Sequence, residues 1–442
     1  MVKITQNVEA AYEIESTYGS PPGSNLYHLG LLDTFDPRQV ERSVTPVPSL
    51  GQSTDTHHAK GPLGVTLPIK VACQGTGWKQ LIGRAIGEST VDSYKHGNKL
   101  TSGVDSLAIL ARETGGDFTL VTGVVPNEVT LTADYTTGGF VTCEATCTGY
   151  YSLDEADANF DGFLGDDYSS VNFPSAPSTD PLLPTDLSVT AGLAASTKGL
   201  SIDGPAGSYV EVGEKYIQAF NANGTLNTDF DGDGIMDLTN GSFDTVTKIS
   251  TLIEADSNWG STVLGSGGAE LSQNLLKGIY YTGADADEDE TDGSQANIYA
   301  ATDADGTGMT TTFTNLKTVE LKIANNNTPI SGRATGDDSS TEFLLNNAIS
   351  RGKADITLDL TMTAEDETYY DIYHAGTTIP LIRLDFGSEG SIALTNGTIT
   401  AFSRPLAPGA EIVDTMTIKF RGAGNYKNYS AYAISSDITL TP

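Results

Sequence analysis

The clearest pattern in the chain is a two-residue alternation of apolar and polar side chains on both sides of a Thr-Thr-Gly-Gly sequence at residues 136–139. Before it, Val129, Leu131 and Ala133 form the apolar side. After it, the apolar side continues with Val141, Cys143, Ala145 and Cys147. Such a period predicts two antiparallel β-strands joined by a tight turn. The polar side is mostly Thr, which favours strands and can face water or another subunit, so the hairpin is typical of a sheet that lines an interior wall.

Two short helices are predicted elsewhere in the chain. The first begins after Thr76, a suitable N-cap, and ends at Gly87. Its apolar face consists of Trp78, Leu81, Ile82 and Ala85. The second follows Thr363, has acids at residues 365–367 in its first turn, where the helix dipole favours them, and ends near Gly376. Its buried stripe is predicted to be Tyr369, Ile372 and Tyr373.

The composition favours a mainly β protein with many turns, because Gly, Thr, Ser, Asp and Asn occur throughout. Further strands are predicted at residues 354–362, 381–386, 392–394 and 416–420. A chain of 442 residues is expected to hold more than one domain. No apolar run approaches the roughly 20 residues that cross a bilayer, and the N-terminus lacks the apolar core of a signal peptide. We therefore expect a soluble protein made in the cytoplasm, with no membrane partner.

The three cysteines favour a reducing compartment over a disulfide scaffold. Cys143 and Cys147 are four residues apart on one predicted strand, hence roughly 13 Å from each other, which is too far for a disulfide. Cys73 ends another apolar strand face. All three are interpreted as small apolar core residues.

Negative charge is concentrated in the middle of the chain. Residues 151–310 hold 27 of the 57 acids and 4 of the 24 Lys and Arg, so they carry −23 of the net charge of −33. The edges of this segment are rich in Pro and Ser, or in Gly and Thr, as linkers are. We interpret residues 151–310 as an acidic α/β or irregular domain inserted in a loop of a β-domain, since insertions are tolerated at exposed loops.

The best chemical motif lies inside this acidic segment, at residues 229–240. The candidate ligands are Asp229, Asp231, Asp233, the backbone carbonyl of Ile235, and Asp237. Oxygen ligands at this spacing, with Gly234 at the sharp turn, are typical of an EF-hand-type calcium loop. The twelfth position is Asn240 where the loop normally has a bidentate Glu, so another ligand is needed or the motif is an Asp-Gly turn on an acidic surface. We expect calcium, in a structural role.

A second candidate calcium loop spans residues 157–168, with Asp157, Asn159 and Asp161 as ligands. Its twelfth position is Tyr168, which cannot replace Glu. An acidic run at residues 285–293 has no ligand spacing and is interpreted as a solvated tract. Apolar residues at helical spacing predict two further helices, at residues 243–253 and 271–279.

Several blocks of the chain, in their order, resemble the major tail tube proteins of long-tailed, siphovirus-like bacterial or archaeal viruses. The similar blocks are an arm-like segment at 12–24, a strand and helix at 63–87, the hairpin at 118–150 with Thr122-Gly123, and residues 352–406. The resemblance covers roughly residues 1–150 and 311–442. It implies a discontinuous tail tube β-domain of residues 1–150 and 311–442, built from two packed antiparallel sheets and short helices, and an inserted decoration domain of residues 151–310.

The resemblance implies a structural virion protein located in the viral tail. Six copies would form a ring whose sheets join edge to edge, and rings would stack into a tube through which DNA passes at genome delivery. Residues 33–62, which include His57 and His58, would be a long loop that reaches the neighbouring ring. A polar, net-acidic inner wall would repel phosphate, so DNA would pass without sticking. Tape-measure and tail-terminator proteins are further partners that the resemblance implies.

Two other function classes stay open. A secreted or surface calcium-binding adhesin, or an S-layer-like protein, would share the acidic loops and Thr-rich strands, but the missing export signal and the unpaired cysteines count against it. A hydrolase would need a carboxylate pair in a cleft. The five His lie in no zinc or triad motif, and no Gly-Lys phosphate loop is present. We therefore expect no enzymatic activity, and no specific nucleic-acid recognition, which demands a basic face.

Overall fold

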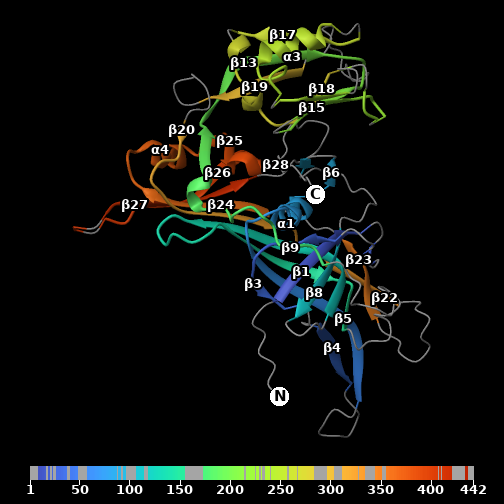
Figure 1. The fold of residues 1–442 in the computed structure, drawn as a ribbon. Coiled ribbons are helices and arrows are strands. Elements are labelled where there is room, and N and C mark those ends of the chain that lie inside the picture. The colour runs from blue at the N-terminus through green and yellow to red at the C-terminus, as the bar shows by residue number, and fades with distance from the viewer. Residues whose placement is uncertain are drawn as a thin grey trace.

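The structure is a computed structural model of the chain. The residues that it describes are 8–15, 18–19, 22, 26–36, 40–47, 57–86, 88–90, 93–95, 106–113, 118–154, 173–213, 216–223, 225–227, 230, 234–238, 240–255, 258–265, 267–282, 296–302, 311–326, 328–333, 344–350, 355–406, 408–409, 411–420 and 434–436. Over these residues the chain is mainly antiparallel β-sheet with three short α-helices (Figure 1), which confirms the predicted fold class.

The largest element is an antiparallel sheet, here called the main sheet. The predicted hairpin lies at its centre, since β9 (Phe118–Asp134) pairs with β10 (Thr142–Gly149) through the register Val129 to Ala145 and Leu131 to Cys143. From one side to the other its strands are β5 (His57–Ala72), β10, β9, β21 (Leu316–Ala324), β24 (Asp355–Thr363), β27 (Val413–Phe420), β26 (Ser391–Ser403), β25 (Thr378–Asp385), β12 (Ser188–Gly192) and β20 (Thr311–Thr312). The predicted strands at 381–386, 392–394 and 416–420 are therefore confirmed.

Strand β9 also belongs to a second sheet, because it is long enough to leave the first one. Residues 118–124 of β9 pair with β8 (Leu107–Glu113) and β11 (Tyr151–Asp154), whereas residues 125–134 pair with β10 and β21. The second sheet is completed by β1 (Val8–Ile14) and β2 (Tyr27–His28). One hydrophobic core joins residues of both sheets, from Ala10 and Ile109 to Leu131 and Leu360.

Helix α1 (Gly77–Ile86) lies in this core as predicted, since all four residues of its apolar face are buried. Helix α4 (Thr368–Ala375) differs from the prediction in two respects. Its acids at 365–367 precede the first turn, and none of its residues is fully buried. Tyr369 and Ile372 pack partly against the core, whereas Tyr373 is exposed. Helix α4 packs against β26 through the side that carries Tyr369 and Ile372, and its other sides stay exposed. Short 3-10 turns lie at Pro184–Asp186, Gly267–Ala269, Ser272–Asn274 and Gly387–Glu389.

A second hydrophobic core forms a separate lobe above the main sheet in Figure 1. Its residues run from Leu200 to Ala300, so it lies within the acidic segment. Two small sheets build it, β17 (Gly260–Leu264), β13 (Ala194–Asp203) and β19 (Ala296–Thr302), and β16 (Ile235–Asp237), β15 (Tyr216–Phe220), β14 (Tyr209–Val212) and β18 (Gly278–Tyr281). Strands β11 and β12 belong to residues 151–310 but pair with β9 and β25 outside the lobe. The division into domains at 150 and 311 stays a prediction.

Helix α3 (Val246–Ile253) of the lobe matches one predicted helix, with Val246, Ile249 and Ile253 buried. The other prediction, a helix at 271–279, is wrong. Leu271 is exposed, a 3-10 turn follows it, and the chain then enters strand β18. Leu275 is buried directly after the 3-10 turn, so the spacing of four residues reflects a turn that leads into a strand and not a helix.

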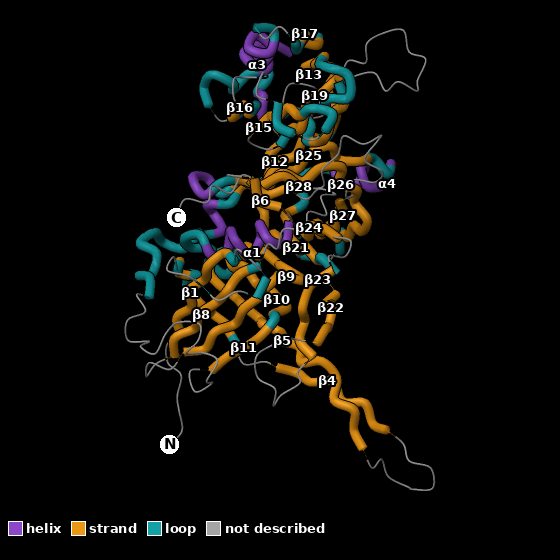
Figure 2. Tube along the Cα trace, turned by 90° about the vertical axis from the view of Figure 1, so that its right-hand side faces the viewer, coloured by secondary structure: helices purple, strands orange, loops and turns teal. Residues whose placement is uncertain are grey.

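Two ribbons of two strands each extend beyond the main sheet. Strand β4 (Val40–Val47) pairs with residues 57–65 of β5, and Figure 2 shows this ribbon projecting away from the sheet. Strands β22 (Thr328–Arg333) and β23 (Leu344–Ser350) form the other. The prediction of a long loop at residues 33–62, with His57 and His58 in it, is therefore wrong, because these residues include paired strands. Short strands β3 (Leu32–Phe35), β6 (Glu88–Thr90), β7 (Ser93–Lys95) and β28 (Ile434–Ser436) complete the fold.

Candidate functional site

The candidate functional site is one face of the main sheet, the face opposite the core, here called the wall face. Residues that are opposite each other on neighbouring strands share a face of the sheet. Glu144 of β10 is opposite Lys70 of β5 and Thr130 of β9, so the three side chains lie on the same face. The register continues through β21, β24 and β27. The threonines of this face are Thr66, Thr130, Thr132, Thr142, Thr146, Thr148, Thr318, Thr357, Thr361, Thr363, Thr415 and Thr417. Their side chains are partly or fully exposed, so the Thr-rich face predicted for one hairpin extends over six strands.

The other face of the same strands is dry. Cys143, Ala145 and Cys147 of β10 are at most 1% exposed, and Cys73 lies beside them in the core. All three cysteines are free thiols, as predicted, and burial raises the pKa of Cys143 to about 12. The thiols are therefore held in their protonated form, and they act as small apolar side chains.

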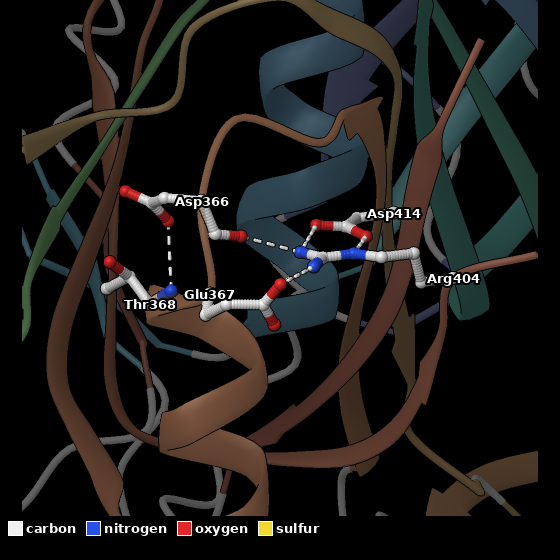
Figure 3. Close-up of polar contacts among 5 residues, drawn as sticks. All are labelled: Asp366, Glu367, Thr368, Arg404 and Asp414. Carbon is white, nitrogen blue, oxygen red and sulfur yellow. Dashed lines mark hydrogen bonds and ion pairs between the residues drawn. The ribbon is translucent and has the colours of Figure 1, made fainter. Parts of the chain in front are cut away.

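Helix α4 is attached to the far end of the main sheet by a charged network around Arg404 (Figure 3). The guanidinium donates from Nε and Nη2 to the two oxygens of Asp414, at 2.6 and 2.8 Å. It also donates from Nη1 to Glu367 and from Nη2 to the carbonyl of Asp366, both at 2.6 Å. The hydrogen bonds to Asp414 raise the pKa of Arg404 above its already high ordinary value. One side chain thus links β27 to the start of α4.

Helix α4 and the segment between β26 and β27 carry several large apolar side chains that are not buried. The ring of Phe402 lies 5.7 Å from that of Tyr370 and 6.0 Å from that of Tyr373. Leu406 is 75% exposed, and Ile412 is exposed as well. We call Tyr370, Tyr373, Phe402, Leu406 and Ile412 the α4 surface. Exposed apolar side chains are typical of a protein contact where they form one patch.

The N-terminal segment is held to the second sheet by the buried carboxylate of Glu15. The amides of Gly19 and Gly123 donate to it at 2.9 and 2.7 Å, and the hydroxyl of Ser106 lies 2.5 Å from it. Burial raises the pKa of Glu15, while these hydrogen bonds act in the opposite direction. Gly123 has a φ of +63°, and a Cβ there would lie 2.5 Å from the Cβ of Tyr150. The Thr122-Gly123 position noted in the sequence is therefore a close approach of β9 to Tyr150, and its glycine amide also holds Glu15.

The first candidate metal loop is only partly within the described residues. Asp229, Asp231 and Asp233 lie outside them. Ile235 and Asp237 belong to strand β16, directly after Gly234, whose φ of +83° provides the predicted sharp turn. The side chain of Asn240 at the twelfth position accepts a hydrogen bond from the amide of Ser242 at 3.0 Å. Calcium binding by this loop stays a prediction.

The second candidate loop, with Asp157, Asn159 and Asp161, lies entirely outside the described residues. Within the described part of the chain, no three His, Cys, Asp or Glu side chains are grouped closely enough to hold a metal ion. In the same residues, none of the helices is both long and apolar enough to cross a membrane.

Sequence reasoning missed both polar anchors, the Arg404 network and the Glu15 carboxylate. Arg404 and Asp414 are ten residues apart and meet only because β26 and β27 pair. Glu15 meets Gly123 across a separation of 108 residues. A cation followed by proline, or a Glu after a strand, carries no local signal of such contacts.

No family model matches the chain, and no curated protein matches it. Two solved structures are similar to parts of it. The tail of an empty gene transfer agent particle, with C6 symmetry, is 16% identical with a TM-score of 0.21, over 28% of this chain and 90% of that chain. The virion of a native gene transfer agent particle is 15% identical with a TM-score of 0.18, over 23% of this chain and 78% of that chain. TM-scores of this size establish no shared overall fold.

Proposed function

We propose that the chain is a structural virion protein whose copies join into hexameric rings, which stack into a viral tail tube that DNA traverses at genome delivery. The observation that carries the proposal is the wall face. It is a continuous, partly exposed, Thr-rich surface on β5, β10, β9, β21, β24 and β27, and the other side of the same strands is a dry core. The order of sequence blocks that resemble tail tube proteins supports the same function, and no catalytic role is proposed.

The width of the wall face suits a tube. Neighbouring strands lie about 4.8 Å apart, so six strands span roughly 24 Å. Six copies that each contribute these six strands to the lining would enclose a barrel on the order of 50 Å across, before strand tilt is considered. Such a barrel is wider than a DNA duplex. Thr hydroxyls toward the lumen would stay hydrated and would offer no apolar surface to which DNA bases or a tape-measure protein could adhere.

The proposed assembly uses the parts of the fold that are incomplete in one copy. A two-stranded ribbon is marginal in water by itself, and the β4–β5 and β22–β23 ribbons both extend past the main sheet. We assign these ribbons to contacts between stacked rings, and the α4 surface to the contact within a ring. Ring closure would also pair strand edges that otherwise promote aggregation. A tail-terminator protein would cap the last ring in the same way.

The acidic lobe is proposed to face outward from the tube and to hold calcium in the loop at residues 229–240. Its charge would be multiplied around a ring, and repulsion of that kind is screened only in solvent. A variant that joins Gly192 to Thr311 through a short flexible linker keeps β12 paired with β25 and removes the lobe. It is expected to form tubes of unchanged inner diameter and smaller outer diameter.

Electron microscopy of the purified protein tests the proposal. Hexameric rings or tubes support it, whereas monomers or flat lattices would favour the surface-protein alternative. Leu406→Asp adds a charge to the α4 surface at an exposed position and is expected to abolish rings without unfolding the chain, as judged by circular dichroism. Leu271→Asp is the matched control, because Leu271 is an exposed leucine of the lobe. Equal loss of rings in both variants would contradict the assignment of the α4 surface.

A further inference from the structure

Three lysines of the wall face lie in one row across the sheet. Residues that pair from strand to strand define this row, which runs perpendicular to the strands. From β5 to β27 its members are Lys70, Glu144, Thr130, Lys322, Thr357 and Lys419. With strands about 4.8 Å apart, Lys70 and Lys322 are separated by roughly 14 Å, and Lys322 and Lys419 by roughly 10 Å. By itself this row would be a line of cations suited to phosphate groups.

Acids surround the lysine row on the same face. The row on one side contains Glu320 and Asp359, which pair with each other. The row on the other side contains Glu128 and Asp355, both opposite Ala324. These acids outnumber the three lysines of the row, and they lie two residues from the row along β9, β21 and β24.

Two of the lysines make direct ion pairs with acids. Lys322 Nζ lies 2.8 Å from Glu128 Oε1, and Lys70 Nζ lies 2.9 Å from Asp33 Oδ2. Glu144 is directly opposite Lys70, and both acids raise the pKa of this lysine. Such half-exposed pairs add little to stability, about 1 kcal/mol or less. Their effect on a passing polyanion is larger, because each lysine that meets an acid no longer attracts a phosphate.

We propose that Asp33, Glu128 and Glu144 screen the lysine row, and that this screening prevents the wall face from holding the phosphate backbone of DNA. The inference rests on the proposed tube function, in which DNA is the molecule that moves past this face. The lysines in turn offset the acids beside them, because like charges on neighbouring strands of one face destabilise a sheet. Without these acids, the lysine row would bind the DNA phosphates with release of counterions.

The test measures binding of a short fluorescent DNA duplex to the soluble subunit by anisotropy, at several salt concentrations. The wall variant is Asp33→Asn, Glu128→Gln and Glu144→Gln together. The charge-matched control is Asp203→Asn, Glu254→Gln and Glu270→Gln in the lobe, which changes the net charge by the same amount. We expect binding by the wall variant only, with a slope of log K against log salt of about −2.7 for three lysines, at roughly 0.9 per phosphate contact.

A further variant adds Lys70→Gln, Lys322→Gln and Lys419→Gln to the wall variant and is expected to lose the binding again. Equal binding by the lobe control would overturn the proposal, because net charge would then be the cause. Binding by the unchanged protein, absence of binding by the wall variant, or binding that survives loss of the lysines would also overturn it. Ring formation is scored separately by electron microscopy, so failure of the tube proposal and failure of the screening proposal are distinguishable.

Discussion

Replacement of Arg404 by Met is expected to destabilise the far end of the main sheet by about 3 kcal/mol. Met keeps most of the apolar stem but removes both hydrogen bonds from the guanidinium to Asp414, whose side chain is 2% exposed. A buried carboxylate that loses its cation typically costs about 3–5 kcal/mol. The lower value applies here, because the Arg404 side chain is 18% exposed and water can reach part of the space that it leaves.

The contact with Glu367 contributes far less to this loss. The side chain of Glu367 is 65% exposed, and ion pairs with exposed partners contribute about 1 kcal/mol or less. Glu367→Gln is therefore expected to cost at most about 1 kcal/mol. The double variant Arg404→Met with Asp414→Asn should lose less unfolding free energy than the two single variants lose together. The difference should be about 1.5 kcal/mol or more, because no uncompensated charge is left.

Urea unfolding followed by circular dichroism gives the free energies, and amide hydrogen exchange gives the location. We expect faster exchange in α4 and unchanged exchange in α1. Lys317→Met is the matched control, since it breaks a partly exposed pair with Glu411 and is expected to cost at most about 1 kcal/mol. A loss for Arg404→Met that equals the control, or a coupling energy near zero, would refute the reasoning.

Three further outcomes follow from single sites. Gly123→Ala should cost about 2–4 kcal/mol in urea unfolding, since a positive φ and the close Tyr150 act together. Gly138 also has a positive φ but nothing within 4 Å, so Gly138→Ala should cost only about 1–2 kcal/mol. Equal costs for the two variants would contradict the packing argument. Burial raises the pKa of Glu15 above 4.5 in the folded protein. The stability that the Glu15 carboxyl contributes is therefore present below pH 4.5 and is lost as the pH rises through the pKa of the folded protein. Glu15→Gln should make the melting temperature depend less on pH between about pH 4 and 7. An unchanged pH dependence would contradict this role of Glu15. A chelator should lower the melting temperature of the lobe but not of the main sheet if the loop at 229–240 binds calcium; identical scans, with no metal by elemental analysis, would remove the claim.

Local patterns predicted the elements whose environment repeats along the chain. The β9–β10 hairpin and α1 each bury one regular side, so alternation and helical spacing were enough. The β4–β5 ribbon was missed because its sequence is polar around His57 and His58 and does not alternate as a half-buried strand does, so it resembles a loop. The exposed side of α4 was also misjudged. An aromatic stripe predicts that a helix has an apolar face but not whether the sheet or a partner covers that face.

The candidate site was beyond local prediction because it depends on register between distant strands. Lys322 and Thr130 are neighbours only because β21 pairs with β9. The sequence predicts that each strand has a polar face, since apolar residues alternate, but it cannot place Lys70 and Lys322 in the same row. A shift of one residue in any pairing would move core side chains to the wall face, so the burial pattern selects the register, and the register determines the charge pattern.

Pro126 explains where the wall face ends. A proline has no amide hydrogen to donate to a neighbouring strand, and the β9–β10 pairing shifts at this point, so that Cys147 is opposite Pro126 while Thr146 is opposite Glu128. Asn127 is the extra residue, and its carbonyl accepts from the amide of Asn325 at 2.8 Å instead. A bulge of this kind bends a strand. Beyond it, the β9 residue opposite Thr148 is the buried Val125, and β9 turns into the second sheet, so a single proline separates the part of β9 in the wall face from the buried part of the same strand.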